Sequence, residues 1–274
     1  ALTSFNQMYR GVRATFDNSA LGIQLWAALA RDKKGTLPAL HANFDVWMGR
    51  HGERVFGKFA NEQDALARET GEFTTAEMAR YGRVRFGGDE TEYTVRGALS
   101  RVPGVKRSNR AFGVTGDVRR HTWFKSEMKS EFAKGRTKGE IIASGDAERA
   151  GLAINNGTGW SEYRTGGDLG ELTFFAARFL QSRLETVARA GMGLRPGATL
   201  DQRIARGAMG NLIWQGTAAT IVINKLLGND TDFRPMVNGH KNSNFMRIRF
   251  GDRDISVFGS WELFPRAIIA TASG

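Results

Sequence analysis

The sequence concentrates positive charge between Lys106 and Lys138, where ten lysines and arginines accompany three acidic residues. Over all 274 residues, 39 Lys and Arg exceed 28 Asp and Glu and give a formal net charge of +11. Clustered cations neutralise phosphates and release counterions, so such binding depends on salt and tolerates any base sequence. An aromatic ring beside them can stack on an exposed base. The candidate nucleic-acid-binding residues are Lys106, Arg107, Arg110, Arg119, Arg120, Trp123, Lys125 and Lys129.

One long helix must position these side chains. Pro103 suits the first turn of a helix, and apolar residues then recur every three or four positions from Val114 to Phe132, which is typical of one buried face. We therefore expect an amphipathic helix whose basic residues occupy the remaining arc and face DNA or another acidic surface. The alternative is that this arc is a solvated or subunit-facing helix surface.

A second notable segment is Gly207–Asn224, which has no formal charge over eighteen residues. At about 1.5 Å per residue it is roughly 27 Å long, close to the approximately 30 Å of a bilayer core. Thr220 and Asn224 are among several polar residues that interrupt it. Two interpretations remain: an ordinary buried helix, or a segment that meets lipid at some stage. The residues that form the core or contact the membrane in these two cases include Leu212, Ile213, Ile223 and Leu226.

Sequence signatures of catalysis are absent. The chain has no phosphate-binding G-x-x-x-x-G-K-[ST] loop, no G-x-S-x-G elbow and no H-E-x-x-H. It has no cysteine, and its four histidines are scattered, so we expect no metal, no cofactor and no small-molecule substrate. The acids at Asp89, Glu90 and Glu92 are typical of a solvated surface, and Asp230 and Asp232 of a turn. We expect a protein that is not an enzyme.

The remaining patterns predict a mainly α fold, an irregular multi-helix bundle with one small C-terminal β-hairpin. Alternating residues on either side of Gly251–Arg253 predict the hairpin, and a closing helix follows it. Thr74 and Glu77 form a capping-box signature. We expect two helical regions, residues 1–150 and 151–274, within a section of a longer chain. Helices are expected at residues 20–30, 36–48, 74–81, 146–154, 172–190 and 201–228.

Several short motifs then carry a family resemblance. They resemble the helical regions of very large tailed-phage proteins, namely internal virion or DNA-ejection proteins and the related phage polyvalent proteins. Earlier segments at Thr15–Leu21 and Val102–Phe112 resemble the opening helix break and the basic helix start of that family. The later motifs are Phe174–Arg178, Ser182–Leu184, Asn244–Ile248 and Asp254–Gly259.

The resemblance implies a function in genome delivery. It implies a protein that is packaged inside the capsid and that leaves with or before the genome to build a conduit through the host envelope. Its partners would be copies of itself, other virion or ejection proteins, double-stranded DNA and the host envelope membrane. Enzymatic modules generally lie elsewhere in such chains, so no catalytic residue is transferred. The alternatives are a nucleic-acid-binding or scaffolding module of a large phage enzyme, and a fixed tail or portal-associated subunit.

Overall fold

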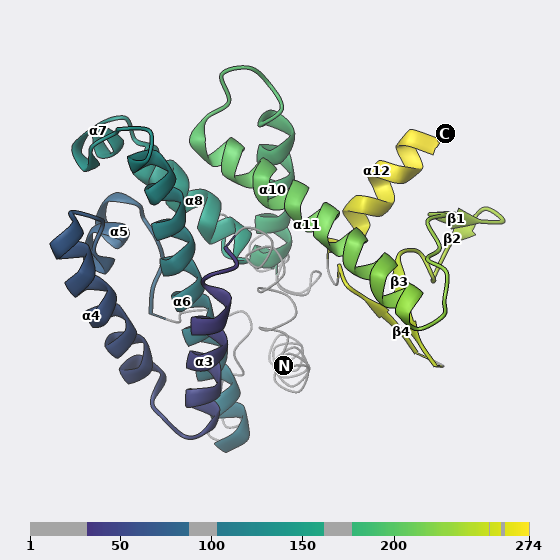
Figure 1. The fold of residues 1–274 in the computed structure, drawn as a ribbon, viewed down its shortest axis with the longest axis horizontal. Coiled ribbons are helices and arrows are strands. Elements are labelled where there is room, and N and C mark those ends of the chain that lie inside the picture. The colour runs from purple at the N-terminus through teal and green to yellow at the C-terminus, as the bar shows by residue number, and fades with distance from the viewer. Residues whose placement is uncertain (1–31, 88–102, 162–176, 252, 259–260, 274) are drawn as a thin grey trace, which may run out of the picture. The chain divides into compact units, whose positions relative to one another are not determined.

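Helices dominate the computed structural model of the chain (Figure 1), which describes residues 32–87, 103–161, 177–251, 253–258 and 261–273. The predicted mainly α fold with a small C-terminal β-hairpin is confirmed. The contacts divide the chain into two units, Ala1–Met209 and Gly210–Gly274. The predicted boundary lies between residues 150 and 151. That position lies inside helix α8 (Asp146–Gly157), whose Ala150 and Ile154 belong to the core of the first unit.

In the first unit, a long central helix organises its neighbours. Helix α6 begins at Pro103, as predicted, and ends at Phe132. It packs against α3, α4, α5 and α8. The other described helices of this unit are α3 (Thr36–Trp47), α4 (Gly52–Thr70), α5 (Thr75–Tyr81), α7 (Lys138–Ala143), α8 (Asp146–Gly157), α10 (Ala177–Met192) and the first part of α11 (Leu200–Leu226). The predicted helix at residues 20–30 lies outside the described residues.

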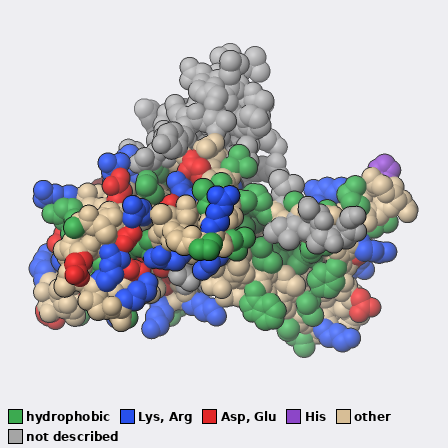
Figure 2. All heavy atoms as spheres, turned by 90° about the horizontal axis from the view of Figure 1, so that it is seen from above, with side chains coloured by type: hydrophobic (Ala, Val, Ile, Leu, Met, Phe, Trp, Pro, Cys, Tyr) green, Lys and Arg blue, Asp and Glu red, His purple; other side chains and the backbone are tan. Residues whose placement is uncertain are grey.

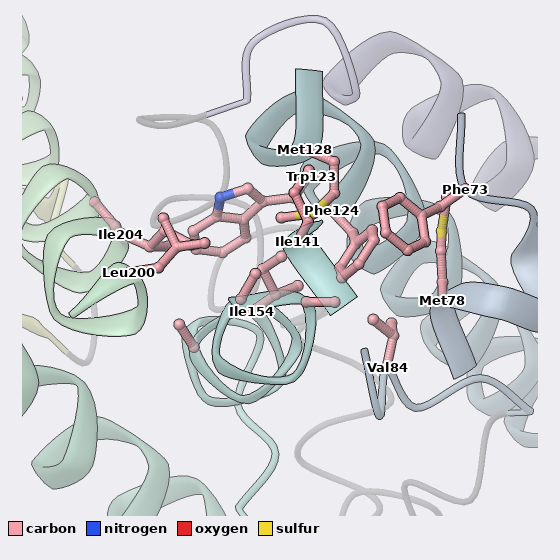
Figure 3. Packing of buried hydrophobic residues seen from close by; sticks show 14 residues of the cluster. Phe73, Met78, Val84, Trp123, Phe124, Met128, Ile141, Ile154, Leu200 and Ile204 are labelled. Carbon is pink, nitrogen blue, oxygen red and sulfur yellow. The ribbon is translucent and has the colours of Figure 1, made fainter. Parts of the chain in front are cut away.

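The core of the first unit forms around α6 (Figure 3). The Phe124 ring meets the edge of Phe73 at 5.5 Å, while Trp123 points toward Leu200 and Ile204 at the start of α11. Burying one such side chain contributes about 1.5–3 kcal/mol. The apolar spacing of the α6 sequence thus marks residues that hold several helices together.

Two capping boxes start short helices at this core. The Thr74 hydroxyl accepts from the Glu77 N–H while the Glu77 carboxylate accepts from the Thr74 N–H, as the sequence predicts. Thr137 and Glu140 repeat the arrangement at the start of α7. Each cap contributes about 1 kcal/mol because it satisfies N–H groups that the helix leaves unpaired.

The second unit combines the end of α11 with two short hairpins and a closing helix. Strands β3 (Arg247–Phe250) and β4 (Arg253–Ser256) pair antiparallel, which confirms the predicted hairpin. A second pair, β1 (Met236–Val237) and β2 (His240–Lys241), surrounds Asn238-Gly239, where both residues have positive φ. This dipeptide is a known signal for a tight hairpin turn. Helix α12 spans Leu263–Ser273.

Candidate nucleic-acid interface

Three of the predicted nucleic-acid-binding residues are buried inside the first unit. The exposed fraction is 0% for Arg119, 2% for Arg120 and 1% for Trp123. The prediction that they occupy an exposed arc of α6 is therefore wrong. Helix α6 is enclosed by neighbouring helices on several sides, so that even its polar arc lies against protein. No nucleic acid can reach these three side chains in this fold.

Arg119 instead ties α6 to the start of α3. Its Nη1 donates to the Asp32 carbonyl at 3.1 Å and to the Thr36 hydroxyl at 2.9 Å. Burial lowers the pKa of Arg119 to about 10, while the Asp32 carboxylate acts in the opposite direction. Its guanidinium stays charged at neutral pH and serves as a structural connection.

Arg120 connects α6 to two other segments. Its Nε donates to the Thr158 hydroxyl at 2.9 Å, and its Nη1 lies 3.4 Å from Asp117 Oδ1 and donates to the Arg85 carbonyl. Both charged side chains of the Arg120–Asp117 pair are almost fully buried. Such a pair contributes little when intact, but removing one partner is costly because the other charge stays buried.

Acids on α6 itself and on neighbouring segments neutralise most of the remaining basic stretch. Lys125 pairs with Glu72 at 3.1 Å and also donates to Gln63, whereas Lys129 is exposed and lies 3.9 Å from the same Glu72 carboxylate. The later cations form further ion pairs, which are Lys134–Glu131, Arg136–Glu131, Arg136–Asp146 and Lys138–Glu77.

The described candidates that keep available charge lie at the start of α6. Arg107 is exposed and Arg110 is half-buried, and the described residues include no ion-pair partner for either. The side chain of Lys106 lies outside the described part. The predicted basic stripe is therefore reduced to Arg107 and Arg110 at the start of α6, with Lys129 exposed in its last turn.

The turn between α3 and α4 brings further cations to Arg107 and Arg110. Gly49 in this turn has φ +100°, and a Cβ built on it would lie 4.0 Å from Arg107 Nη2. A Cβ on Gly52 would lie 3.6 Å from the Arg110 Cβ and only 2.9 Å from Val114. The turn thus lies directly against the start of α6, with Arg50 between the two glycines.

A groove opens between α3 and α4 next to this turn. Its volume is about 550 Å³. Its lining combines apolar residues such as Ala42 and Val55 with charged side chains. These cations were not predicted, although Arg54 and Lys58 are four residues apart, a spacing that places two side chains on one face of a helix. The charged and histidine residues lining the groove are His41, Asp45, Arg50, His51, Arg54, Lys58 and Glu62.

His121 is buried close to the groove but does not line it. Its ring meets Phe59 edge-on at 5.2 Å and lies 6.2 Å from Phe86. Burial lowers the pKa of His121 to about 4, with Lys125 acting in the same direction and Asp64 in the opposite one. Among the described residues, neither ring nitrogen has a hydrogen-bond partner. The imidazole is therefore neutral at pH 7.

The four core or membrane candidates on α11 have different environments. Leu212 is buried and Ile213 is half-buried, whereas Ile223 is partly exposed and Leu226 is 81% exposed. The four candidates do not share one buried face, because the buried row of this part of α11 consists of Leu212, Gly216, Thr220 and Asn224. No helix in the described part of the chain has the length and apolar content that crossing a bilayer requires.

The described residues contain no group of three or more His, Asp or Glu side chains that could hold a metal. Asp232 accepts hydrogen bonds from the backbone N–H and the guanidinium of Arg234, two residues further on, and these bonds hold a local turn. These bonds lower the pKa of Asp232 far below its ordinary value. Comparisons with protein families, with curated proteins and with solved structures find nothing that matches this chain.

Proposed function

We propose that this chain is a non-enzymatic section of a tailed-phage virion protein that is packaged in the capsid and helps to deliver the genome. We propose further that it acts as one subunit of a multimer. The family part of this proposal rests on the sequence resemblance. The multimer rests on one observation, the unshielded apolar face of α11 in the second unit.

That face carries large side chains in contact with solvent. Trp214 is 72% exposed, Ile221 43% and Val222 55%, and Leu226 follows on the next turn. Figure 2 shows hydrophobic side chains gathered over the part of the surface that belongs to this unit. Extended apolar patches on a soluble protein mark interaction sites. Tryptophan in particular supplies much of the binding energy in protein interfaces.

The chemistry of this face favours a second copy of the chain as its partner. Lys225 is the one formal charge that α11 carries between residues 214 and 226. Two such faces bury apolar area against each other without burying an acid, and each Lys225 can keep its ammonium in water because its long stem reaches the edge. Trp214 and Ile221 are seven residues apart and so lie on nearly the same line of the helix. They form a natural centre for the contact.

Light scattering after size-exclusion chromatography tests the multimer. The unaltered chain should elute as an oligomer, and Trp214→Glu/Ile221→Glu should elute as a monomer, because each carboxylate would have to be buried. Leu37→Glu/Leu194→Glu is the matched control, since both leucines are exposed in the first unit. A monomeric unaltered chain would refute the multimer. If the monomer also bound anionic vesicles through Trp214 and Ile221, this face of α11 would be a lipid-binding surface.

Mass spectrometry of phage particles that contain the protein tests its role in delivery. If the protein is ejected, it should be present in full particles and depleted after genome release. Retention after release would favour the fixed tail or portal-associated subunit. Detection of the same polypeptide as part of a large enzyme would favour the scaffolding module.

A further inference from the structure

The cations around the α3–α4 turn form a surface that the function proposed above does not yet use. We name it the basic rim and define it as Arg50, Arg54, Lys58, Arg107 and Arg110. Figure 1 shows the α3–α4 turn and the start of α6 at the same end of these helices. The space beside Gly49 and Gly52 is bounded by Arg107 and Arg110, because a Cβ built on either glycine would lie within 4.0 Å of one of them, so the turn lies against α6 there.

We propose that the basic rim binds the phosphate backbone of double-stranded DNA. The proposal rests on the proposed function in genome delivery, because it names the surface that meets the genome. It also relocates the nucleic-acid contact from the buried middle of α6 to an end of that helix, where a second segment of the chain adds its own arginines.

The charge of the basic rim is available to a ligand. Arg54 and Arg107 are exposed, and neither has an ion-pair partner among the described residues. Arg50 pairs with Asp45 and Lys58 lies 3.9 Å from Glu62, yet their side chains remain 66% and 78% exposed. Exposed pairs of this kind are weak, so a phosphate can replace the carboxylate with little loss.

The acids on the same elements leave a net positive surface. Asp45, Glu53 and Glu62 are the acids that the groove and the first turn of α4 contribute, against five Lys and Arg of the basic rim. The first turn of α4 has backbone N–H groups without partners inside the helix, and its N-cap residue His51 forms no side-chain cap. The positive end of the helix dipole thus adds to the field of the arginines.

The geometry favours phosphates over bases. Arg54 and Lys58 lie one turn apart on α4, about 6 Å along its axis, and Arg50 lies in the turn just before this helix. A guanidinium binds phosphate oxygens through two parallel hydrogen bonds. Phe59 is the single phenyl ring that lines the groove, and it is half-buried and already packs against His121 and Phe56. Contact through phosphates alone predicts binding without base preference.

Fluorescence anisotropy with a labelled DNA duplex, repeated over a series of salt concentrations, tests the basic rim. Arg54→Glu/Arg107→Glu should weaken binding at least about tenfold and reduce the slope of log K against log salt by about 2, since each lost phosphate contact accounts for about 0.9. The control is Arg68→Glu/Arg195→Glu, which reverses two exposed arginines elsewhere in the first unit and changes the net charge equally. The control should keep most of the affinity and the slope.

Three results would overturn the proposal. The first is no salt-dependent binding of the duplex by the unaltered chain. The second is an equal loss in both double variants, because binding would then follow net charge alone. The third is displacement of the duplex by polyglutamate as readily as by unlabelled DNA, which would indicate an acidic protein partner. Circular dichroism verifies the fold of each variant. The multimer does not depend on these residues, so light scattering distinguishes a failure here from a failure of the proposed function.

Discussion

Asn224 on α11 pairs with Arg249 on β3 much as a neighbouring strand would. The Arg249 N–H donates to Asn224 Oδ1 at 2.9 Å, and Asn224 Nδ2 donates to the Arg247 carbonyl at 2.8 Å. Strand β3 has β4 on one edge only, so this amide satisfies two backbone groups on the other edge. A polar residue in an uncharged helix segment therefore anchors the hairpin of the second unit.

Asn224→Leu should destabilise the second unit by about 3 kcal/mol, because two backbone groups lose their partners. Hydrogen exchange at the Arg249 amide, followed by mass spectrometry, should accelerate correspondingly. Asn61→Leu, on the exposed surface of α4, should change stability by less than about 0.5 kcal/mol. Unchanged exchange at Arg249 would show that this hydrogen bond does not hold the strand.

Acid should weaken the first unit through His121. The pKa of His121 is about 4 in the fold and 6.5 when unfolded, so the unfolded chain binds more protons between these values and stability falls as the pH drops from 6.5 to 4. The loss approaches about 3 kcal/mol, at 1.36 kcal/mol per pKa unit. Urea denaturation at several pH values should give a flatter profile for His121→Leu than for the unaltered chain. Parallel profiles in the two proteins would contradict this assignment.

Breaking the buried pair at Arg120 should be costly for stability but should spare DNA binding. Arg120→Met should lower the free energy of unfolding by about 3–5 kcal/mol because Asp117 then loses its buried counter-charge. Adding Asp117→Asn should cost less than the sum of the two single changes, as coupled residues require. Anisotropy measured on the folded fraction should show unchanged affinity for the duplex. Additive costs would mean that the two charges do not interact.

Replacing two glycines of the first unit with alanine should change the stability of the protein in opposite directions. A Cβ on Gly157 would lie 2.5 Å from Trp123 Cη2, so Gly157→Ala should cost about 1–3 kcal/mol through overpacking. Gly57 in α4 has no neighbouring atom within 4 Å of an added Cβ, so Gly57→Ala should stabilise by about 0.5–1 kcal/mol. Thermal unfolding monitored by circular dichroism measures both. A stabilising Gly157→Ala would contradict the close packing of α8 on α6.

Elements with strong local signals were predictable. The helix from Pro103, the capping box at Thr74 and the turn at Gly251 depend on residues that are near one another in the sequence. The predicted end of the helix at residue 154 was wrong, because contacts with residues distant in the sequence extend this helix to Gly157. Asn155-Asn156-Gly157 is a turn signal, yet α8 continues through it because Asn155 bonds to Arg83 and Arg85 and Gly157 fits against Trp123.

In the candidate interface, too, some properties follow from the sequence alone and others depend on tertiary packing. Charge, helical periodicity and the identity of the basic residues are properties of the sequence alone, and they correctly indicate where α6 runs. Whether an arginine on that helix meets water or protein depends on segments that pack from elsewhere in the chain. Arg119 bonds to the start of α3 and Arg120 to Thr158 beyond α8, whereas Arg107 is left outside beside the α3–α4 turn. Periodicity records only which residues share a face, and tertiary packing decides what covers that face.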